Sequence, residues 1–238
     1  MPDKSYFYVP VEVQAGEEFE ISGQQYNYIA NVKRNSPGEE LEIVDGRGHI
    51  ILSKIQDIDK KSVRCLAREV RRAENEIPVH ITVAVALIKQ QRYEVMVEKA
   101  TELGVHTIQP LLTQRVVRKG FRPERLEKKA VAAMQQSERA FLPEIPEPVG
   151  VKKYIANKEN NQLFVAAQSA KSKSLIDLLS KREYANIIIL IGPEGGWSDS
   201  ELSLFNERDI QNFHLGKRRL RTETAALSAL SQVSLYFE

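Results

Sequence analysis

The sequence predicts an α/β protein with two parts, a small N-terminal β-barrel and a larger C-terminal domain built on a mainly parallel sheet. Two observations predict this architecture. The first seventy or so residues contain only strand-like segments with turn signals between them, whereas strand-like and helix-like segments alternate from Val79 onward. Repeated strand–helix units with apolar strands are typical of a parallel sheet that helices cover on both faces. We therefore expect domains at residues 1–72 and 73–238.

The N-terminal segments show the alternation of half-buried strands. Apolar and polar residues alternate over residues 16–23, and residues 36–55 contain two strand-like runs joined around Asp45 and Gly46. Strands at this spacing with no helices between them favour a small barrel. The charged stretch from Arg68 to Pro78 is interpreted as a linker to the second domain.

The C-terminal segments alternate between the two-residue period of strands and the 3.6-residue period of helices. Residues 92–104 show the clearest helical pattern, with apolar side chains at helical spacing and Gly104 as the stop. Pro123 opens another helix. The expected strands are residues 79–87, 106–112, 163–168, 186–192 and 213–216, and the expected helices are residues 92–104, 123–140, 174–182, 199–207 and 223–237.

Composition excludes several classes of protein. The chain has 238 residues, of which 42% are hydrophobic and 28% charged, as in ordinary globular proteins. A single cysteine, Cys65, excludes an intramolecular disulfide and any multi-cysteine metal site. The four histidines are scattered along the chain, so we expect no metal. No signal peptide and no membrane-spanning run is recognisable, so we expect a cytoplasmic protein without a membrane partner.

Basic residues are clustered although the net charge is only +2. Residues 60–72 carry six basic side chains against one acidic, residues 115–129 carry seven against two, and residues 217–221 carry four against none. One such cluster is usually a solvated face. Three clusters in a nearly neutral chain favour RNA or another polyanion as the partner.

A glycine-rich turn, IGPEGG, follows the apolar strand that ends at Ile191. Ligands of parallel sheets bind at the carboxyl ends of strands, and glycines let a ligand approach the backbone closely. Ser198 and Glu201 form the pattern of a capping box after the turn, and Trp197 can pack on Leu202. The turn lacks the lysine of an NTPase phosphate loop and the spacing of a dinucleotide site. A plain tight turn remains possible.

A second string with the same layout, LGKRRLRTETAALSAL, covers residues 215–230. It contains a strand end, a loop rich in donors, and a helix for which Thr222 and Thr224 are candidate caps or ligand contacts. Together the two strings resemble the small-subunit (16S) ribosomal RNA uridine N3-methyltransferase family, in the SPOUT class. Residues 97–115 and 135–145 resemble further segments of that family, and Lys33 and Arg34 resemble its N-terminal basic pair. The chain departs from the family pattern at Lys217, at Arg219 and near the N-terminus.

The resemblance implies a fold and an activity that periodicity does not show. It implies a PUA-like barrel that helps to hold RNA, and a C-terminal domain whose last segments form a trefoil knot, a rare exception in protein topology. S-adenosylmethionine would bind in a bent form in the knot loops. The enzyme would be a homodimer that methylates N3 of one uridine in the 16S rRNA of the small ribosomal subunit.

The hypothesis assigns roles to residues of this chain. Arg139 and Arg221 are candidates to hold the uracil oxygens or a phosphate, and Glu223 and Glu194 are candidate general bases. The expected cofactor contacts are Leu190, Gly192, Pro193, Gly195, Gly196, Leu215, Gly216, Leu220 and Thr222. The expected RNA contacts are Lys33, Arg34, Lys89, Arg115, Arg118 and Lys119.

Further functions remain open at this point. A related SPOUT enzyme could methylate another base position or a ribose 2′-hydroxyl. The chain could also be a non-catalytic RNA-binding assembly factor, or an enzyme of small-molecule metabolism. The methylated atom, and the choice between S-adenosylmethionine and nucleotides as ligand, would distinguish these functions.

Overall fold

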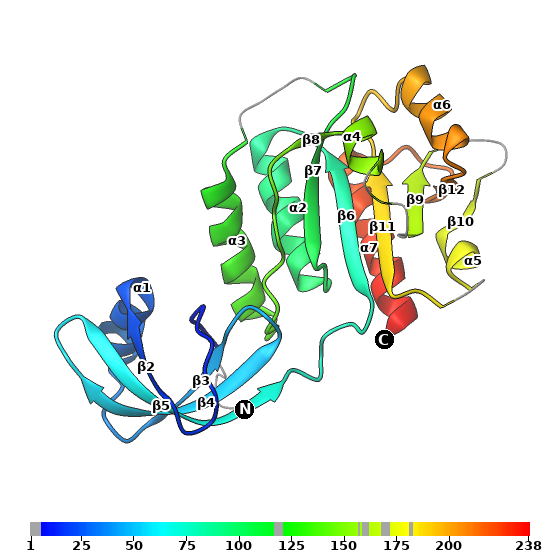
Figure 1. Ribbon diagram of the computed structural model, residues 1–238. Helices are drawn as coiled ribbons and strands as arrows, with labels where there is room; N and C mark the ends of the chain where they lie inside the picture. The colour runs from blue at the N-terminus through cyan, green and yellow to red at the C-terminus, as the bar shows by residue number, and fades with distance from the viewer. Residues whose placement is uncertain (1–5, 117–120, 157, 159–161, 168–171, 181–182) are drawn as a thin grey trace. The chain divides into compact units, whose positions relative to one another are not determined.

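The computed structural model describes residues 6–116, 121–156, 158, 162–167, 172–180 and 183–238 (Figure 1). Contacts divide the chain into two compact units. The first contains Met1–Glu76 and Val131–Leu142, and the second contains Ile77–Ala130 and Pro143–Glu238. The domain ranges 1–72 and 73–238 stay a prediction, because the contacts group a segment from the middle of the chain with the first unit.

The first unit is a five-stranded sheet in the order β1-β3-β4-β5-β2. Only β1 and β3 run parallel; the other neighbours are antiparallel. The expected two strands around Asp45 and Gly46 are confirmed as β3 and β4. The strands are β1 (Phe7–Tyr8), β2 (Glu18–Ser22), β3 (Glu40–Val44), β4 (His49–Ile58) and β5 (Ser62–Arg72).

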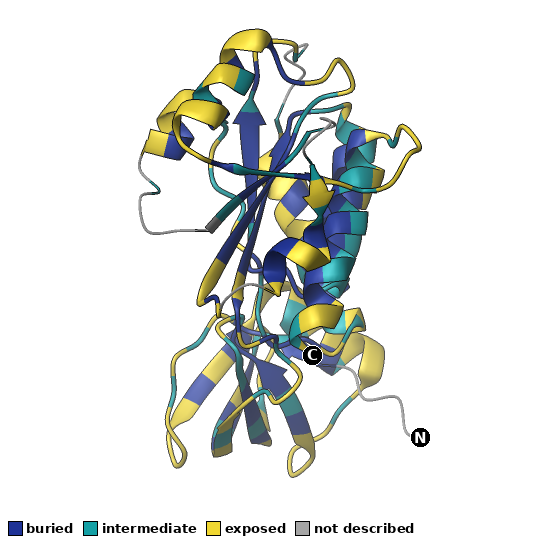
Figure 2. Cartoon of the chain, turned by 90° about the vertical axis from the view of Figure 1, so that its right-hand side faces the viewer, coloured by how far each residue is buried: buried dark blue, intermediate teal, exposed yellow. Residues whose placement is uncertain are grey.

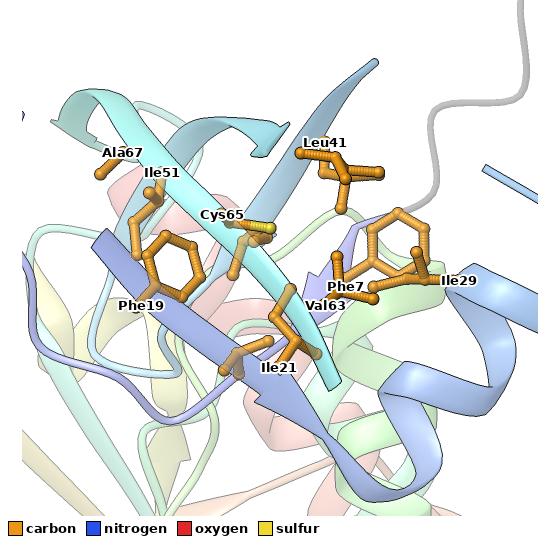
Figure 3. Packing of buried hydrophobic residues seen from close by; sticks show 12 residues of the cluster. Phe7, Phe19, Ile21, Ile29, Leu41, Ile51, Val63, Cys65 and Ala67 are labelled. Carbon is orange, nitrogen blue, oxygen red and sulfur yellow. The ribbon is translucent and has the colours of Figure 1, made fainter. Parts of the chain in front are cut away.

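Alternation along the strands builds the core of this unit. Phe19 and Ile21 of β2 are buried while their neighbours in the strand are exposed. They pack with Val63 and Cys65 of β5, and Figure 3 shows these side chains packed together. One side of the sheet is therefore apolar, as period-2 patterning requires.

Two expectations for this unit are wrong. The stretch interpreted as a linker from Arg68 is strand up to Arg72, since β5 pairs with β4 along its length. The interval between β2 and β3 was expected to contain no helix, but it holds α1 (Gly23–Tyr26) and a π-helical segment (Asn27–Lys33). Arg34 ends that segment with a left-handed φ of 57°.

The second unit is a seven-stranded sheet in the order β10-β12-β9-β11-β6-β7-β8. Every pairing in it is parallel, as the sequence predicts. The central strand β11 lies between β9 and β6. The strands are β6 (His80–Ala86), β7 (Thr107–Leu112), β8 (Val149–Gly150), β9 (Gln162–Ala166), β10 (Lys173–Ser174), β11 (Asn186–Ile191) and β12 (Gln211–His214).

Helices pack on both faces of this sheet, and Figure 2 shows its central strands as mostly buried. Residues of α4 and α6 pack against one face of the sheet, where they share an apolar cluster with Ile188 and Leu190 of β11. The long helix α7 contacts α2, β6 and β11. The helices are α2 (Gln90–Glu102), α3 (Pro123–Gln136), α4 (Val151–Ala156), α5 (Leu175–Leu179), α6 (Asp199–Glu207) and α7 (Thr222–Phe237).

The helical expectations are confirmed in position but not in every boundary. Helix α3 ends at Gln136, four residues before the expected end, and α4 was not expected. The expected strand end at Gln168 and the expected helix end at Lys181 and Arg182 lie outside the described residues. The apolar strands β6 and β11 carry the strongest signal and lie at the centre of the sheet.

Candidate active site

The glycine turn follows the carboxyl end of the central strand β11. The backbone N–H of Gly196 donates to the carbonyl of Pro193 at 2.8 Å, and Gly196 has a φ of 72°, which side-chain-bearing residues rarely adopt. A Cβ on Gly192 would lie 2.9 Å from the ring of Trp197. The turn therefore needs glycine at both positions. Position 196 requires it for the left-handed backbone angle, and position 192 requires it because Trp197 leaves no space for a side chain.

The helix after the turn begins with the expected capping box. Ser198 Oγ accepts the backbone N–H of Glu201 at 3.2 Å, and Glu201 Oε2 accepts that of Ser198 at 2.8 Å. The other carboxylate oxygen of Glu201 accepts the N–H of Gln114 at 3.0 Å. Glu201 thus joins the start of α6 to the loop after β7. The sequence predicted the box but not this second bond.

Trp197, at the end of the glycine turn, connects the turn to strand β9 and helix α6. Its indole Nε1 donates to the carbonyl of Ala166, at the end of β9, at 3.1 Å. Its ring makes an edge contact with Phe205 of α6, with 4.9 Å between centroids. Leu202, the expected partner of Trp197, packs against the same apolar cluster. The strand ends of β9 and β11 are therefore held together by one side chain.

The second string follows β12 and contacts the glycine turn. Thr222 Oγ1 donates to the carbonyl of Gly192 at 3.0 Å, and Arg219 Nη2 donates to the carbonyl of Glu194 at 2.7 Å. The expectation that Thr222 or Thr224 caps the helix is wrong: α7 begins at Thr222, and its N-cap residue Arg221 makes no side-chain cap bond. The hydroxyl of Thr222 ties the two loops together instead.

These two loops enclose a pocket of about 250 Å³. Gly196 borders open space, because a Cβ there would meet nothing within 4 Å. Leu190, by contrast, is buried in the apolar cluster beside α6, and neither Leu215 nor Gly216 lines the pocket. The expected cofactor residues that do line it are Gly192, Pro193, Gly195, Gly196, Leu220 and Thr222, and the others in its lining are Ala166, Ile191, Glu194, Trp197, Arg219 and Ala225.

A second pocket of about 230 Å³ adjoins the same turn. It shares Pro193, Glu194 and Gly195 with the first pocket. Lys89 and Arg115, both expected RNA contacts, lie in its wall, and Arg115 Nη1 donates to the carbonyl of Gly195 at 3.2 Å. The residues Pro193, Glu194 and Gly195 of the turn therefore line both pockets, and each pocket also has basic side chains in its wall: Arg219 in the first, Lys89 and Arg115 in the second.

Both candidate bases contact Arg92, a residue to which the sequence analysis gave no role. Arg92 Nη1 is bonded to Glu194 Oε1, and Arg92 Nε lies 3.7 Å from Glu223 Oε1. Glu194 is largely exposed, whereas the side chain of Glu223 is 14% exposed. Glu223 Oε2 is buried and has no hydrogen-bond partner among the described residues. Arg221 is exposed just before α7.

Arg139, the remaining catalytic candidate, belongs to the first unit. Its Nε and Nη2 donate to Glu76 Oε2 at 3.1 and 2.7 Å. The other oxygen of Glu76 accepts the backbone N–H groups of Ala140 and Phe141, each at 3.0 Å. Arg139 is almost fully buried. This geometry favours a structural role, and a contact between Arg139 and uracil stays a prediction.

The expected RNA contacts are only partly described. Lys33 and Arg34 are exposed at the end of the π-helical segment of the first unit, and Lys89 is exposed directly before α2. Arg118 and Lys119 lie outside the described residues. Within the described ranges no group of three or more acidic, histidine or cysteine side chains could hold a metal ion. In that same part of the chain, no helix is both long and apolar enough to span a bilayer.

Comparison with known proteins decides the family. The chain matches the RNA methyltransferase domain over residues 75–234 and the RNA methyltransferase PUA domain over residues 21–67. It is 32% identical to ribosomal RNA small subunit methyltransferase E of Synechocystis, over 92% of this chain and 73% of that protein. The chain belongs to this methyltransferase E family. The Bacillus subtilis member is 29% identical, over 95% of this chain and 93% of the relative.

Solved structures of methyltransferases have the same fold. The enzyme of Neisseria gonorrhoeae, bound to S-adenosyl methionine, superposes with a TM-score of 0.85 at 27% identity, over 98% of each chain. A Legionella pneumophila structure with the cofactor SAM bound has a TM-score of 0.83 at 31% identity, again over 98% of each chain. The resemblance seen in the sequence and the PUA-like and α/β parts of the fold are confirmed.

Proposed function

We propose that this methyltransferase E family member transfers a methyl group from S-adenosylmethionine to N3 of one uridine in the 16S rRNA of the small ribosomal subunit. The family membership supports an RNA methyltransferase, and relatives with the same fold have been solved with S-adenosylmethionine bound. The observation that carries the proposal is the pair of loops, held together by Thr222 and Arg219, that encloses a pocket at the carboxyl ends of β9 and β11.

The residues of the first pocket fit the cofactor. Two glycines, Gly195 and Gly196, expose backbone along its wall, and the open space beside Gly196 admits a ligand close to the main chain. Backbone groups suit adenine, because they read its edge without charged side chains. S-adenosylmethionine supplies its methyl group as an electrophile, and its sulfur retains the electron pair of the carbon–sulfur bond that breaks. Leu220 lines this pocket too, and its main chain is assigned to the site. Contacts of the cofactor with Leu190, Leu215 and Gly216, which do not line the pocket, stay predictions.

Glu223 is the better of the two candidate bases. Uridine N3 carries a proton on its pairing edge, so the base has to be unpaired to react. A carboxylate oxygen that is buried and has no partner among the described residues, like Glu223 Oε2, can accept that proton. Glu194 is the weaker candidate because its side chain is 58% exposed and bonded to Arg92. Arg221, at the start of α7, is proposed to stabilise the negative charge that develops on the uracil oxygens.

The RNA is proposed to contact basic residues of both units. Lys89 and Arg115 line the second pocket beside the turn, and Lys33 and Arg34 are exposed in the first unit. These contacts act mostly through phosphates, so affinity should fall steeply with salt. The homodimer, the trefoil knot and the cytoplasmic location implied by the family are part of the same proposal.

The test uses 16S rRNA, free and in assembled small subunits, from a strain that lacks the gene. We expect methyl transfer from labelled S-adenosylmethionine, and N3-methyluridine as the only new nucleoside after digestion and mass spectrometry. A Glu223→Gln variant should bind the cofactor normally in calorimetry and react roughly 10²–10⁴-fold more slowly. A 2′-O-methylated product, or methylation of another base position, would contradict the assignment of the reacting atom.

A further inference from the structure

Three arginines from three different elements contact the glycine turn. Arg115, after β7, donates to the carbonyl of Gly195, and Arg219, after β12, donates to that of Glu194. Arg92, on the first turn of α2, binds the side chain of Glu194. Of these three, Arg92 also reaches the carboxylate of Glu223. Arg92 therefore links the turn after β11 to the start of α7.

Arg92 contacts one oxygen of the Glu223 carboxylate and not the other. Arg92 Nε lies 3.7 Å from Oε1 of Glu223, while Oε2 is buried and without a hydrogen-bond partner among the described residues. A guanidinium is planar and rigid, and its nitrogens point in fixed directions, so it can bridge two carboxylates in one arrangement. Arg92 is thus the cation that faces Oε1 of Glu223, at the distance of an ion pair rather than of a hydrogen bond.

The exposure of this cluster argues against a purely structural role. The side chain of Arg92 is 31% exposed and that of Glu194 is 58% exposed. Ion pairs with such access to water contribute little to stability. A small displacement of a catalytic group, however, can slow a reaction by a large factor, because rate depends on near-attack geometry. A residue in this place affects the reaction rate more than it affects folding.

We propose that Arg92 is a positioning residue for the methyl transfer. It holds the Glu223 carboxylate through Oε1, so that Oε2 faces the N3 proton of the uridine, and it keeps Glu194 and its turn against the start of α7. The proton moves from N3 to Oε2, and Arg92 itself neither gains nor loses one. This inference rests on the proposed function, since it requires Glu223 to be the base.

The experiment compares Arg92→Ala and Arg92→Lys with the wild type in steady-state and single-turnover methylation of small subunits. With Ala we expect kcat to fall about 10- to 100-fold, while KM for the RNA and Kd for S-adenosylmethionine stay within about threefold. The Arg92→Lys variant keeps the positive charge but lacks the planar guanidinium with its several donors, so it should recover only part of the rate. The thermal midpoint should barely change.

A matched control lies on the same helix. Lys99 also bridges two carboxylates, with Nζ 2.9 Å from Glu98 Oε1 and 2.8 Å from Glu102 Oε1. Lys99→Ala removes an exposed double ion pair from α2 without touching the loops, and should leave kcat unchanged. If Lys99→Ala slows the reaction as much as Arg92→Ala, the effect belongs to the helix and the proposal fails.

The decisive variant is Arg92→Ala combined with Glu223→Gln. If Arg92 acts through Glu223, the double variant should react at about the rate of Glu223→Gln alone, because residues that act as a unit are not additive. Rate losses that multiply would show that Arg92 acts elsewhere and would overturn the proposal, as would an Arg92→Ala enzyme with wild-type kcat. Failure of the proposed function is distinct, since the wild type itself would then form no N3-methyluridine.

Discussion

Arg139 in the first unit and Arg92 in the second each bind glutamate, in different surroundings. The side chain of Arg139 is 4% exposed and that of its partner Glu76 is 13% exposed, and Glu76 also accepts two backbone N–H groups. Arg92 and Glu194 are several times more exposed, and Glu223 keeps one oxygen without a partner among the described residues. Both oxygens of Glu76 accept hydrogen bonds, whereas the buried Oε2 of Glu223 accepts none among the described residues.

This difference separates two roles that look alike in a sequence. Removal of one partner from a buried ion pair leaves an uncompensated charge and costs about 3–5 kcal/mol. Removal of one partner from an exposed pair costs about 0–1 kcal/mol. We therefore expect changes at Arg139 to act on folding and changes at Arg92 to act on rate.

The largest expected effect is that of Arg139→Ala on the first unit. The change should lower the free energy of unfolding by about 3 kcal/mol. Alkylation of Cys65 measures how often the first unit opens. In the folded protein this thiol is fully buried, and burial raises its pKa to about 11, so it reacts only when the unit opens. Its alkylation rate in the native protein should rise about 100-fold, where 1.4 kcal/mol corresponds to a factor of ten.

Arg92→Ala serves as the comparison in the same assay and should leave the alkylation of Cys65 unchanged. An Arg139→Ala protein that alkylates at the wild-type rate, but no longer methylates RNA, would reverse the roles given to the two arginines. It would support the uracil contact that the sequence resemblance predicts for Arg139.

A smaller effect is expected from salt. Double-mutant cycles on stability should give a coupling of about 3 kcal/mol for Arg139 and Glu76, and about 0.5 kcal/mol for Arg92 and Glu194. Salt screens exposed charges far more than buried ones. The second coupling should vanish in about 1 M KCl while the first persists, as measured by denaturant unfolding. Equal salt sensitivity of the two couplings would remove the distinction in burial.

The smallest expected effects concern the two other arginines of the glycine turn. Arg115→Ala and Arg219→Ala each remove one hydrogen bond to a carbonyl near the surface, at 3.2 and 2.7 Å. Each loss should cost about 0.5 kcal/mol of cofactor affinity, a two- to threefold rise in Kd. Calorimetry with S-adenosylmethionine measures this directly. A rise of about 100-fold for either variant would show that this arginine, unlike Arg92, is needed for cofactor binding.

The sequence predicts the strongly patterned parts of the fold well. The apolar strands, the capping box at Ser198 and the glycine turn are local features, and each is found where expected. The end of β5 was missed because Arg68 to Arg72 are mostly charged, although the strand pairs with β4 along its length. The π-helical segment has no local pattern that distinguishes it from a loop. Local patterning therefore predicts elements better than their ends.

The roles of individual charged residues were the hardest to predict, because their partners are distant in the chain. Arg139 binds Glu76, 63 residues earlier, and Arg92 binds Glu194, 102 residues later. No spacing rule connects such pairs. The motifs located the two loops of the pocket, but the contact between Arg92 and Glu223 could be found only in the three-dimensional structure.

The path of the chain has a consequence for its synthesis. The first unit contains Met1–Glu76 but also Val131–Leu142, and Met134 and Ala140 pack in one apolar cluster with Tyr6, Val44 and Ile50. Domains commonly fold as units during translation, N-terminal first. Here the N-terminal unit cannot be complete until Leu142 has left the ribosome, after more than half of the chain has been made. Until then its sheet is without part of its apolar cover, and apolar surface exposed in this way is prone to aggregation.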